Sequence, residues 1–86
     1  MIVTVDIGNT TISYGAFRSG TRVSYRTFRH RDFFKRRLPA YLRGTERYII
    51  SSVVPGLNAK VARRLKRESD CPFHVIGQDT RLDFPR

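Results

Sequence analysis

Cysteine is nearly absent from this sequence of 86 residues, and long apolar runs are absent altogether. With Cys71 as the only cysteine, an internal disulfide and a cysteine metal cluster are both excluded, and we expect Cys71 to be a small buried or half-buried side chain. No apolar run approaches the ~20 residues of a membrane-spanning helix, so we expect no membrane association. A strand pattern begins at once, without a basic segment followed by an apolar one. We therefore expect no signal peptide and a cytoplasmic protein.

Acidic residues are also scarce, with 7 Asp and Glu against 17 Lys and Arg, which gives a formal net charge of +10. Such a charge attracts nucleic acid, acidic membrane surfaces and nucleotides. The alternative is a solvated basic surface without a specific partner. The length allows one domain at most, and 40% hydrophobic residues with 12% aromatics indicate a folded chain rather than a disordered one.

Three short strands are predicted first, at residues 2–6, 11–17 and 22–28, because β-rich runs there alternate with turn signals. Their short connections predict an antiparallel meander. The period then changes, and a helix is expected from about Arg31 to near Leu38, where Pro39 interrupts it. The remaining elements are a strand, a helix, a strand and a polar tail or linker, at residues 46–54, 55–69, 72–76 and 77–86.

This order of elements predicts an α/β fold with a mixed five-stranded sheet. Right-handed crossovers place the strands in the order 3-2-1-4-5, with only strands 1, 4 and 5 mutually parallel and with helices packed on the faces of the sheet. The expected architecture is a ribonuclease H-like core over residues 1–76. Helix residues Phe34 and Leu38 are expected to cover the sheet, and the most buried positions are expected to be Val3, Val5, Ile49, Ile50 and Val61.

The opening segment carries the candidate site. Asp6 ends the central strand, and ligands of α/β sheets bind beyond the carboxyl ends of strands. Gly8 allows a tight turn and a close approach of the backbone, and the amides of Gly8 to Thr11, with the Thr10 and Thr11 hydroxyls, can donate to an anion. Asp6 would act through magnesium or a metal-bound water. The alternative is an ordinary turn at Gly8-Asn9, with Asp6 capping its own backbone.

Two motifs then indicate a family. The segment DIGNTTISYGAF at positions 6–17 resembles the phosphate-binding motif of type III pantothenate kinases, and ISSVVPGLN at 50–58 resembles their strand-to-helix junction. The closing HVIGQDTRLDF also suits the family, which belongs to the acetate-and-sugar-kinase, heat-shock-protein-70 and actin superfamily and has two ribonuclease H-like domains. The resemblance covers essentially this whole chain and about the N-terminal third of the family's length. It implies ATP-dependent phosphorylation of pantothenate to 4'-phosphopantothenate, the first step of coenzyme A synthesis.

The resemblance also implies roles for residues. Asp6 would position magnesium, and the family further implies a monovalent cation. Ser51 and Ser52 are expected either to line the site or to satisfy backbone groups near a helix start. The nucleotide-binding residues would be Asp6, Ile7, Gly8, Asn9, Thr10, Thr11, Ile12 and Ser13.

Other family motifs do not occur in these 86 residues. The Gly-Ala-Asp-Arg motif for base and substrate, the second phosphate motif and the adenosine contacts are missing, and no Walker-type or Gly-x-Gly-x-x-Gly loop replaces them. His30 and His74 are interpreted as structural or surface residues. We therefore expect the N-terminal part of a kinase, without a catalytic residue of its own and inactive by itself. It would need a C-terminal kinase domain in cis or in trans, or it is a degenerate non-catalytic relative. The resemblance separately implies a homodimer.

A second hypothesis is a small basic nucleic-acid-binding module, because arginines and aromatics interleave in one segment. The alternatives are a solvated helix face above core aromatics, or a basic surface that docks an acidic partner domain. The residues concerned are Arg22, Arg26, Arg29, Arg31, Lys35, Arg36 and Arg37, with Tyr25, Phe28, Phe33 and Phe34 between them.

Overall fold

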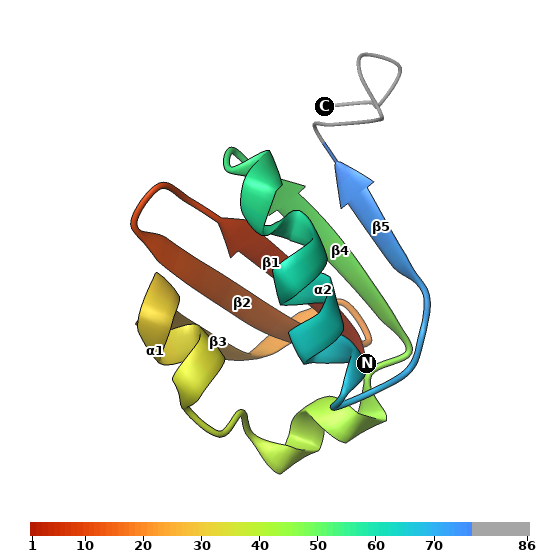
Figure 1. Ribbon diagram of the computed structural model, residues 1–86. Coiled ribbons are helices and arrows are strands. Elements are labelled where there is room, and N and C mark those ends of the chain that lie inside the picture. The colour runs from red at the N-terminus through yellow and green to blue at the C-terminus, as the bar shows by residue number, and fades with distance from the viewer. Residues whose placement is uncertain (77–86) are drawn as a thin grey trace.

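The computed structural model describes residues 1–76 and contains a five-stranded sheet in the order β3-β2-β1-β4-β5, as the sequence predicts (Figure 1). The expectation of a polar tail at 77–86 lies outside the described residues. Short 3-10 turns, η1 (Ala40–Gly44) and η2 (Pro55–Leu57), precede β4 and α2. The main elements are β1 (Ile2–Ile7), β2 (Thr11–Arg18), β3 (Thr21–Arg29), α1 (His30–Lys35), β4 (Arg47–Ser52), α2 (Asn58–Lys66) and β5 (Phe73–Ile76).

Strand directions differ in one respect from the expectation. β1 pairs in parallel with β4, and β4 with β5, as predicted. β2 pairs antiparallel with both β1 and β3, so β3 runs in the same direction as β1. The prediction that only strands 1, 4 and 5 share a direction was therefore wrong, because a strand two places along a meander regains the direction of the first.

Both helices pack against the sheet, as expected, and they lie on the same face of it (Figure 1). The crossover from β3 to β4 and the crossover from β4 to β5 advance in the same direction across the sheet. Two right-handed crossovers that advance in one direction must put their helices on one side. The opposite sheet face is therefore free of helices within residues 1–76.

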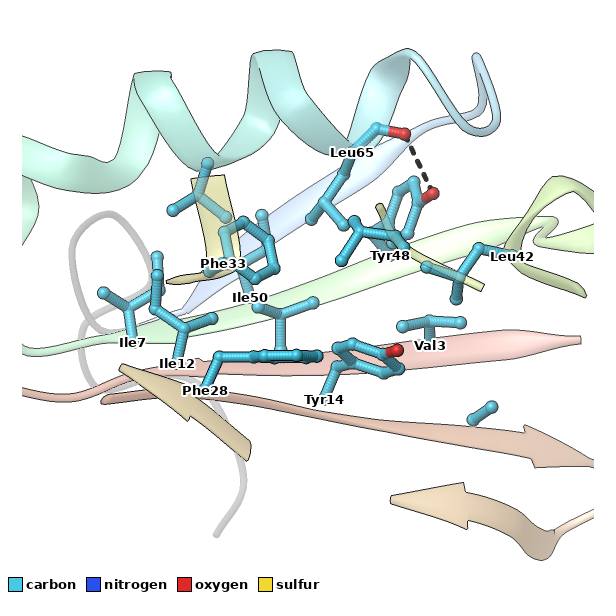
Figure 2. Close-up of a cluster of buried hydrophobic side chains, with 14 residues drawn as sticks. Val3, Ile7, Ile12, Tyr14, Phe28, Phe33, Leu42, Tyr48, Ile50 and Leu65 are labelled. Carbon is cyan, nitrogen blue, oxygen red and sulfur yellow. Dashed lines mark hydrogen bonds between the residues drawn. The ribbon is translucent and has the colours of Figure 1, made fainter. Parts of the chain in front are cut away.

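The hydrophobic core fills the space between this sheet and the helix layer (Figure 2). Alternation along the strands sends every second side chain into it. Four of the predicted positions are confirmed as buried, and Ile49 is only half-buried because its neighbours in β4 take the helix side. The largest fully buried side chains among the described residues are Val3, Val5, Ile7, Ile12, Tyr14, Phe33, Leu42, Tyr48, Ile50, Val61 and Leu65.

Helix α1 is shorter than the sequence predicts. It ends at Lys35, and Arg36 is extended with ψ of 154°. Continuation of the helix is also disfavoured further along, because Leu38 precedes Pro39 and a residue before proline is biased away from helix. Phe33 enters the core, whereas Phe34, which was expected to cover the sheet, is only half-buried against it.

Two smaller expectations can also be compared with the structure. Cys71 is half-buried and packs against the core, as predicted. Among the described residues, no helix has the length and apolar character that crossing a bilayer requires.

Candidate functional site

The two sequence motifs meet at one end of the sheet. Residues 8–10 join β1 to β2 beyond the carboxyl end of β1, and the junction of β4 with α2 lies at the same end because β4 is parallel to β1 (Figure 1). The Val53 amide donates to the Ile7 carbonyl at 3.0 Å, which ties the two strand ends together. The fold thus brings a glycine-containing loop and a strand-to-helix junction side by side.

Asp6 lies on the sheet face that carries no helix. Its side chain is exposed, and its register partners are Ser13 in β2 and Ser51 in β4. These residues line part of a shallow pocket of about 310 Å³ together with Thr4 and Tyr25. Neither salt bridge found within residues 1–76 involves Asp6, so its carboxylate is not neutralised by a fixed cation there. This arrangement leaves a negative charge accessible beside two hydroxyl-bearing positions.

Hydroxyl groups near Asp6 differ in what they already bind. Ser13 Oγ is 2.9 Å from Thr27 Oγ1, so these two hydroxyls share a hydrogen bond. Ser52 Oγ accepts a hydrogen bond from the Val54 amide at 3.1 Å, which is the backbone role expected as one alternative for this serine. Ser51 is exposed and is the register partner of Asp6 in β4, so its side chain lies beside Asp6 on the sheet face without helices.

Two other residues of the expected nucleotide stretch face the core. Ile7 and Ile12 are paired across β1 and β2, and their side chains are 1% and 0% exposed (Figure 2). Only their backbone groups are therefore available to a ligand. Their side chains anchor the two strands that hold the loop.

The Gly8 amide has a hydrogen-bond partner within the loop itself. It donates to the Thr11 carbonyl at 2.8 Å, so it is not among the amides that the loop leaves without an internal partner. Gly8 does not have a positive φ, and a Cβ placed on it would meet Thr11 O at an ordinary 3.4 Å. The turn itself therefore does not require glycine.

The donors that the loop leaves available come after Gly8. Asn9 and Thr10 are exposed, and no backbone carbonyl among the described residues accepts a hydrogen bond from either amide. Amides without an internal partner in an exposed loop can bind an anion through their N–H groups.

His30 contacts this loop, although it was interpreted from the sequence only as structural or surface. Its Nε2 lies 2.7 Å from the Gly8 carbonyl oxygen, and its backbone amide donates to the Thr10 carbonyl at 3.3 Å. No sequence signal marks this contact, because it joins residues 22 positions apart through the β2–β3 hairpin.

The donor set at the strand end fits magnesium held by a single carboxylate. Within residues 1–76, no group of three or more His, Cys, Asp or Glu side chains is placed to hold a metal ion. Magnesium commonly uses one or two protein carboxylates and completes its coordination with water and phosphate oxygens. Accessible, unpaired Asp6 is compatible with this mode of binding.

The basic segment does not form one stacking surface. Phe28 and Phe33 are 9% and 0% exposed and belong to the core, so they cannot stack on bases. Tyr25 is exposed, with the Arg22 guanidinium 5.1 Å from its ring centroid. The hypothesis of interleaved arginines and stacking aromatics was therefore wrong for Phe28 and Phe33, and the alternative of core aromatics is confirmed for both.

Positive charge gathers instead on the helix layer. A groove of about 440 Å³ runs between α2 and the segment after α1, and Arg64 within it pairs with Glu68 at 2.8 Å. This groove belongs to the helix side of the sheet, whereas Asp6 lies on the other side. Its cationic lining residues are Lys35, Arg36, Arg37, Arg43, Arg64 and Arg67.

Comparison with known proteins gives one finding. A family model described as type III pantothenate kinase matches residues 2–85, which is nearly the whole chain. A search of curated proteins finds no match.

Proposed function

Because this chain belongs to the type III pantothenate kinase family, we propose that it forms the ATP-phosphate-binding part of a kinase that phosphorylates pantothenate. The family implies nucleotide and pantothenate as substrates and a place in coenzyme A biosynthesis. One observation carries the proposal to this chain: accessible Asp6 and the exposed loop at residues 8–10 meet at the carboxyl end of the central strand. Such strand ends are where α/β sheets bind ligands.

Individual residues have separate parts in this proposal. Asp6 would hold magnesium, which when bound neutralises charge on the phosphate oxygens. The Asn9 and Thr10 amides would donate to those oxygens, with Gly8 allowing the phosphate to come close. Ser13 and Ser51 flank Asp6 in the register and would contact the metal's water shell or the nucleotide. The monovalent cation that the family implies is assigned to no residue.

We propose that catalysis also requires the family's Gly-Ala-Asp-Arg motif, which does not occur in these 86 residues. Phosphoryl transfer needs both substrates in position and a carboxylate that receives the proton of the attacking hydroxyl. We infer that residues 1–76 are one ribonuclease H-like domain of the kinase and that the Gly-Ala-Asp-Arg motif must come from another domain, in cis or in trans. Without it, the chain would bind nucleotide weakly and turn over no pantothenate.

A coupled assay for ADP release tests this function. The chain is assayed alone, then fused to or mixed with a polypeptide that carries the family's Gly-Ala-Asp-Arg motif, and finally in that combination with Asp6→Asn. We expect pantothenate-dependent ADP release only from the combination with intact Asp6. Asp6→Asn removes the metal-directed charge and almost no volume, so the fold is expected to persist, as circular dichroism would show.

Two results would contradict the proposal. Robust pantothenate-dependent ADP release from the 86 residues alone would show that they hold the missing groups. Undiminished turnover with Asp6→Asn would refute the proposed role of Asp6 in holding magnesium. Failure of every combination, with no nucleotide binding by the chain, would instead support a degenerate, non-catalytic relative.

A further inference from the structure

We propose that His30 is a positioning residue: its imidazole fixes the Gly8–Asn9 peptide so that the Asn9 amide faces an incoming phosphate. This inference rests on the proposed function and extends it to a residue outside the family motif. His30 begins α1, directly after β3, and it reaches the loop from the neighbouring hairpin.

The donor and the acceptor of the contact between His30 and Gly8 can be assigned. His30 Nε2 lies 2.7 Å from the Gly8 carbonyl oxygen. A carbonyl oxygen can only accept a hydrogen bond, so Nε2 must carry the proton. The half-buried position of the ring gives this bond more weight than an exposed contact would have.

A fixed carbonyl also fixes the amide that follows it. The Gly8–Asn9 peptide is trans, and in a trans peptide the C=O and the next N–H point in opposite directions. When the Gly8 carbonyl points to His30, the Asn9 N–H must point away from it. Rotation of this peptide by half a turn would present a carbonyl oxygen to the phosphate, and two negative groups would then face each other.

Nothing else observed in residues 1–76 holds this peptide. The Gly8 amide, which belongs to the preceding peptide, is bound to Thr11, and the Thr10 carbonyl is bound to the His30 backbone amide. Neither of these bonds involves the Gly8 carbonyl or the Asn9 amide. The His30 side chain is therefore the group that selects the orientation of this one peptide.

A matched pair of substitutions separates positioning from packing. His30→Gln retains an N–H donor on a side chain of similar reach, whereas His30→Met has similar length and no donor. His74→Ala, at an exposed position of β5, is the control for loss of a histidine. Each purified chain is titrated with ADP in the presence of magnesium, and thermal unfolding is recorded in parallel.

We expect His30→Met to weaken ADP binding about tenfold, as loss of one ordering hydrogen bond would. His30→Gln is expected to restore most of the affinity, and His74→Ala to leave it unchanged. A packing role alone would instead lower the unfolding temperature of both His30 variants without separating their affinities. In the unsubstituted chain, the ¹⁵N spectrum of the His30 ring is expected to show the proton on Nε2.

The outcomes are distinguishable from failure of the proposed function. If the unsubstituted chain binds no ADP, the proposed function fails at its first step. If it binds ADP and His30→Met binds equally well, the role of His30 is refuted while the proposed function stands. A proton found on Nδ1 alone would overturn the contact even if neither variant folds.

Discussion

Substitution of Gly8 by alanine would separate a structural reason for this glycine from a functional one. A Cβ at Gly8 would lie 3.4 Å from Thr11 O and 4.0 Å from Thr11 Oγ1, both ordinary contact distances, and φ there is not in the left-handed region. Alanine at an unstrained glycine position stabilises a protein by about 0.4–1 kcal/mol, since it restricts the unfolded chain. We therefore expect Gly8→Ala to leave the free energy of unfolding unchanged or slightly raised.

Gly20 provides the matched control at the other end of β2. It has φ of 78°, follows Ser19 with φ of 53°, and no heavy atom lies within 4 Å of a Cβ built on it, apart from its chain neighbours. Alanine there has room but must adopt a left-handed conformation, which costs an L-residue about 1–2 kcal/mol. Gly20→Ala is expected to lower stability by about that amount and to leave the loop at residues 8–10 untouched.

Urea unfolding and titration with ADP and magnesium would be measured for both variants. If phosphate approaches the Gly8 backbone, a methyl group there should weaken ADP binding about tenfold or more, since it would separate the phosphate from its amide donors. Gly20→Ala should bind ADP as the unsubstituted chain does. Unchanged affinity in Gly8→Ala, or a stability loss equal to that of Gly20→Ala, would refute the reasoning that assigns this glycine to a ligand.

Further predictions concern the core and the N-terminus. Tyr14 OH is buried and has no hydrogen-bond partner among the described residues, whereas Tyr48 OH donates to the Leu65 carbonyl at 3.0 Å. In thermal unfolding, Tyr14→Phe should be neutral or stabilising and Tyr48→Phe should cost about 1 kcal/mol; a reversed order would contradict this account of the core. The N-terminal ammonium of Met1, hydrogen-bonded to Glu46 at 2.8 Å, lowers the Glu46 pKa from its usual 4.5. The stabilisation is therefore full above pH 4.5 and lost as pH falls through the lowered value, so a pH series should show Glu46→Gln converging with the unsubstituted chain in acid. A stability difference that persists unchanged at low pH would exclude this ion pair as its cause.

Sequence periodicity was sufficient for the order of the strands, because alternation and turn residues mark each strand locally. It did not settle which side of the sheet each residue faces. Ile49 is apolar like a core residue, but its neighbours Tyr48 and Ile50 are the ones whose side chains face the helices and the core. The choice between Phe33 and Phe34 likewise depends on where α1 begins, and a shift of one residue turns a helix by 100°.

The sequence identified candidate site residues that are neighbours along the chain, and it missed a residue that joins the site from a distant position. Asp6 lies in the last two residues of β1 and the loop follows directly, so the sequence alone places both at a strand end. The Gly8 amide, which the sequence offers as a donor for an anion, is hydrogen-bonded to the Thr11 carbonyl instead. His30 follows β3 and contacts Gly8 only because the β2–β3 hairpin brings the two residues together. The contact therefore depends on the pairing register of β2 and β3, which no short motif encodes.

The most direct test of the phosphate-binding role is a map of backbone amide chemical shifts during titration with ADP and magnesium. If the loop is the site, the changes should be confined to residues 6–13 and Ser51, should require magnesium, and should be abolished by Asp6→Asn. Changes centred instead on the basic groove of the helix layer, independent of magnesium and weakened steeply by salt, would show a general attraction of polyanions and contradict the assignment.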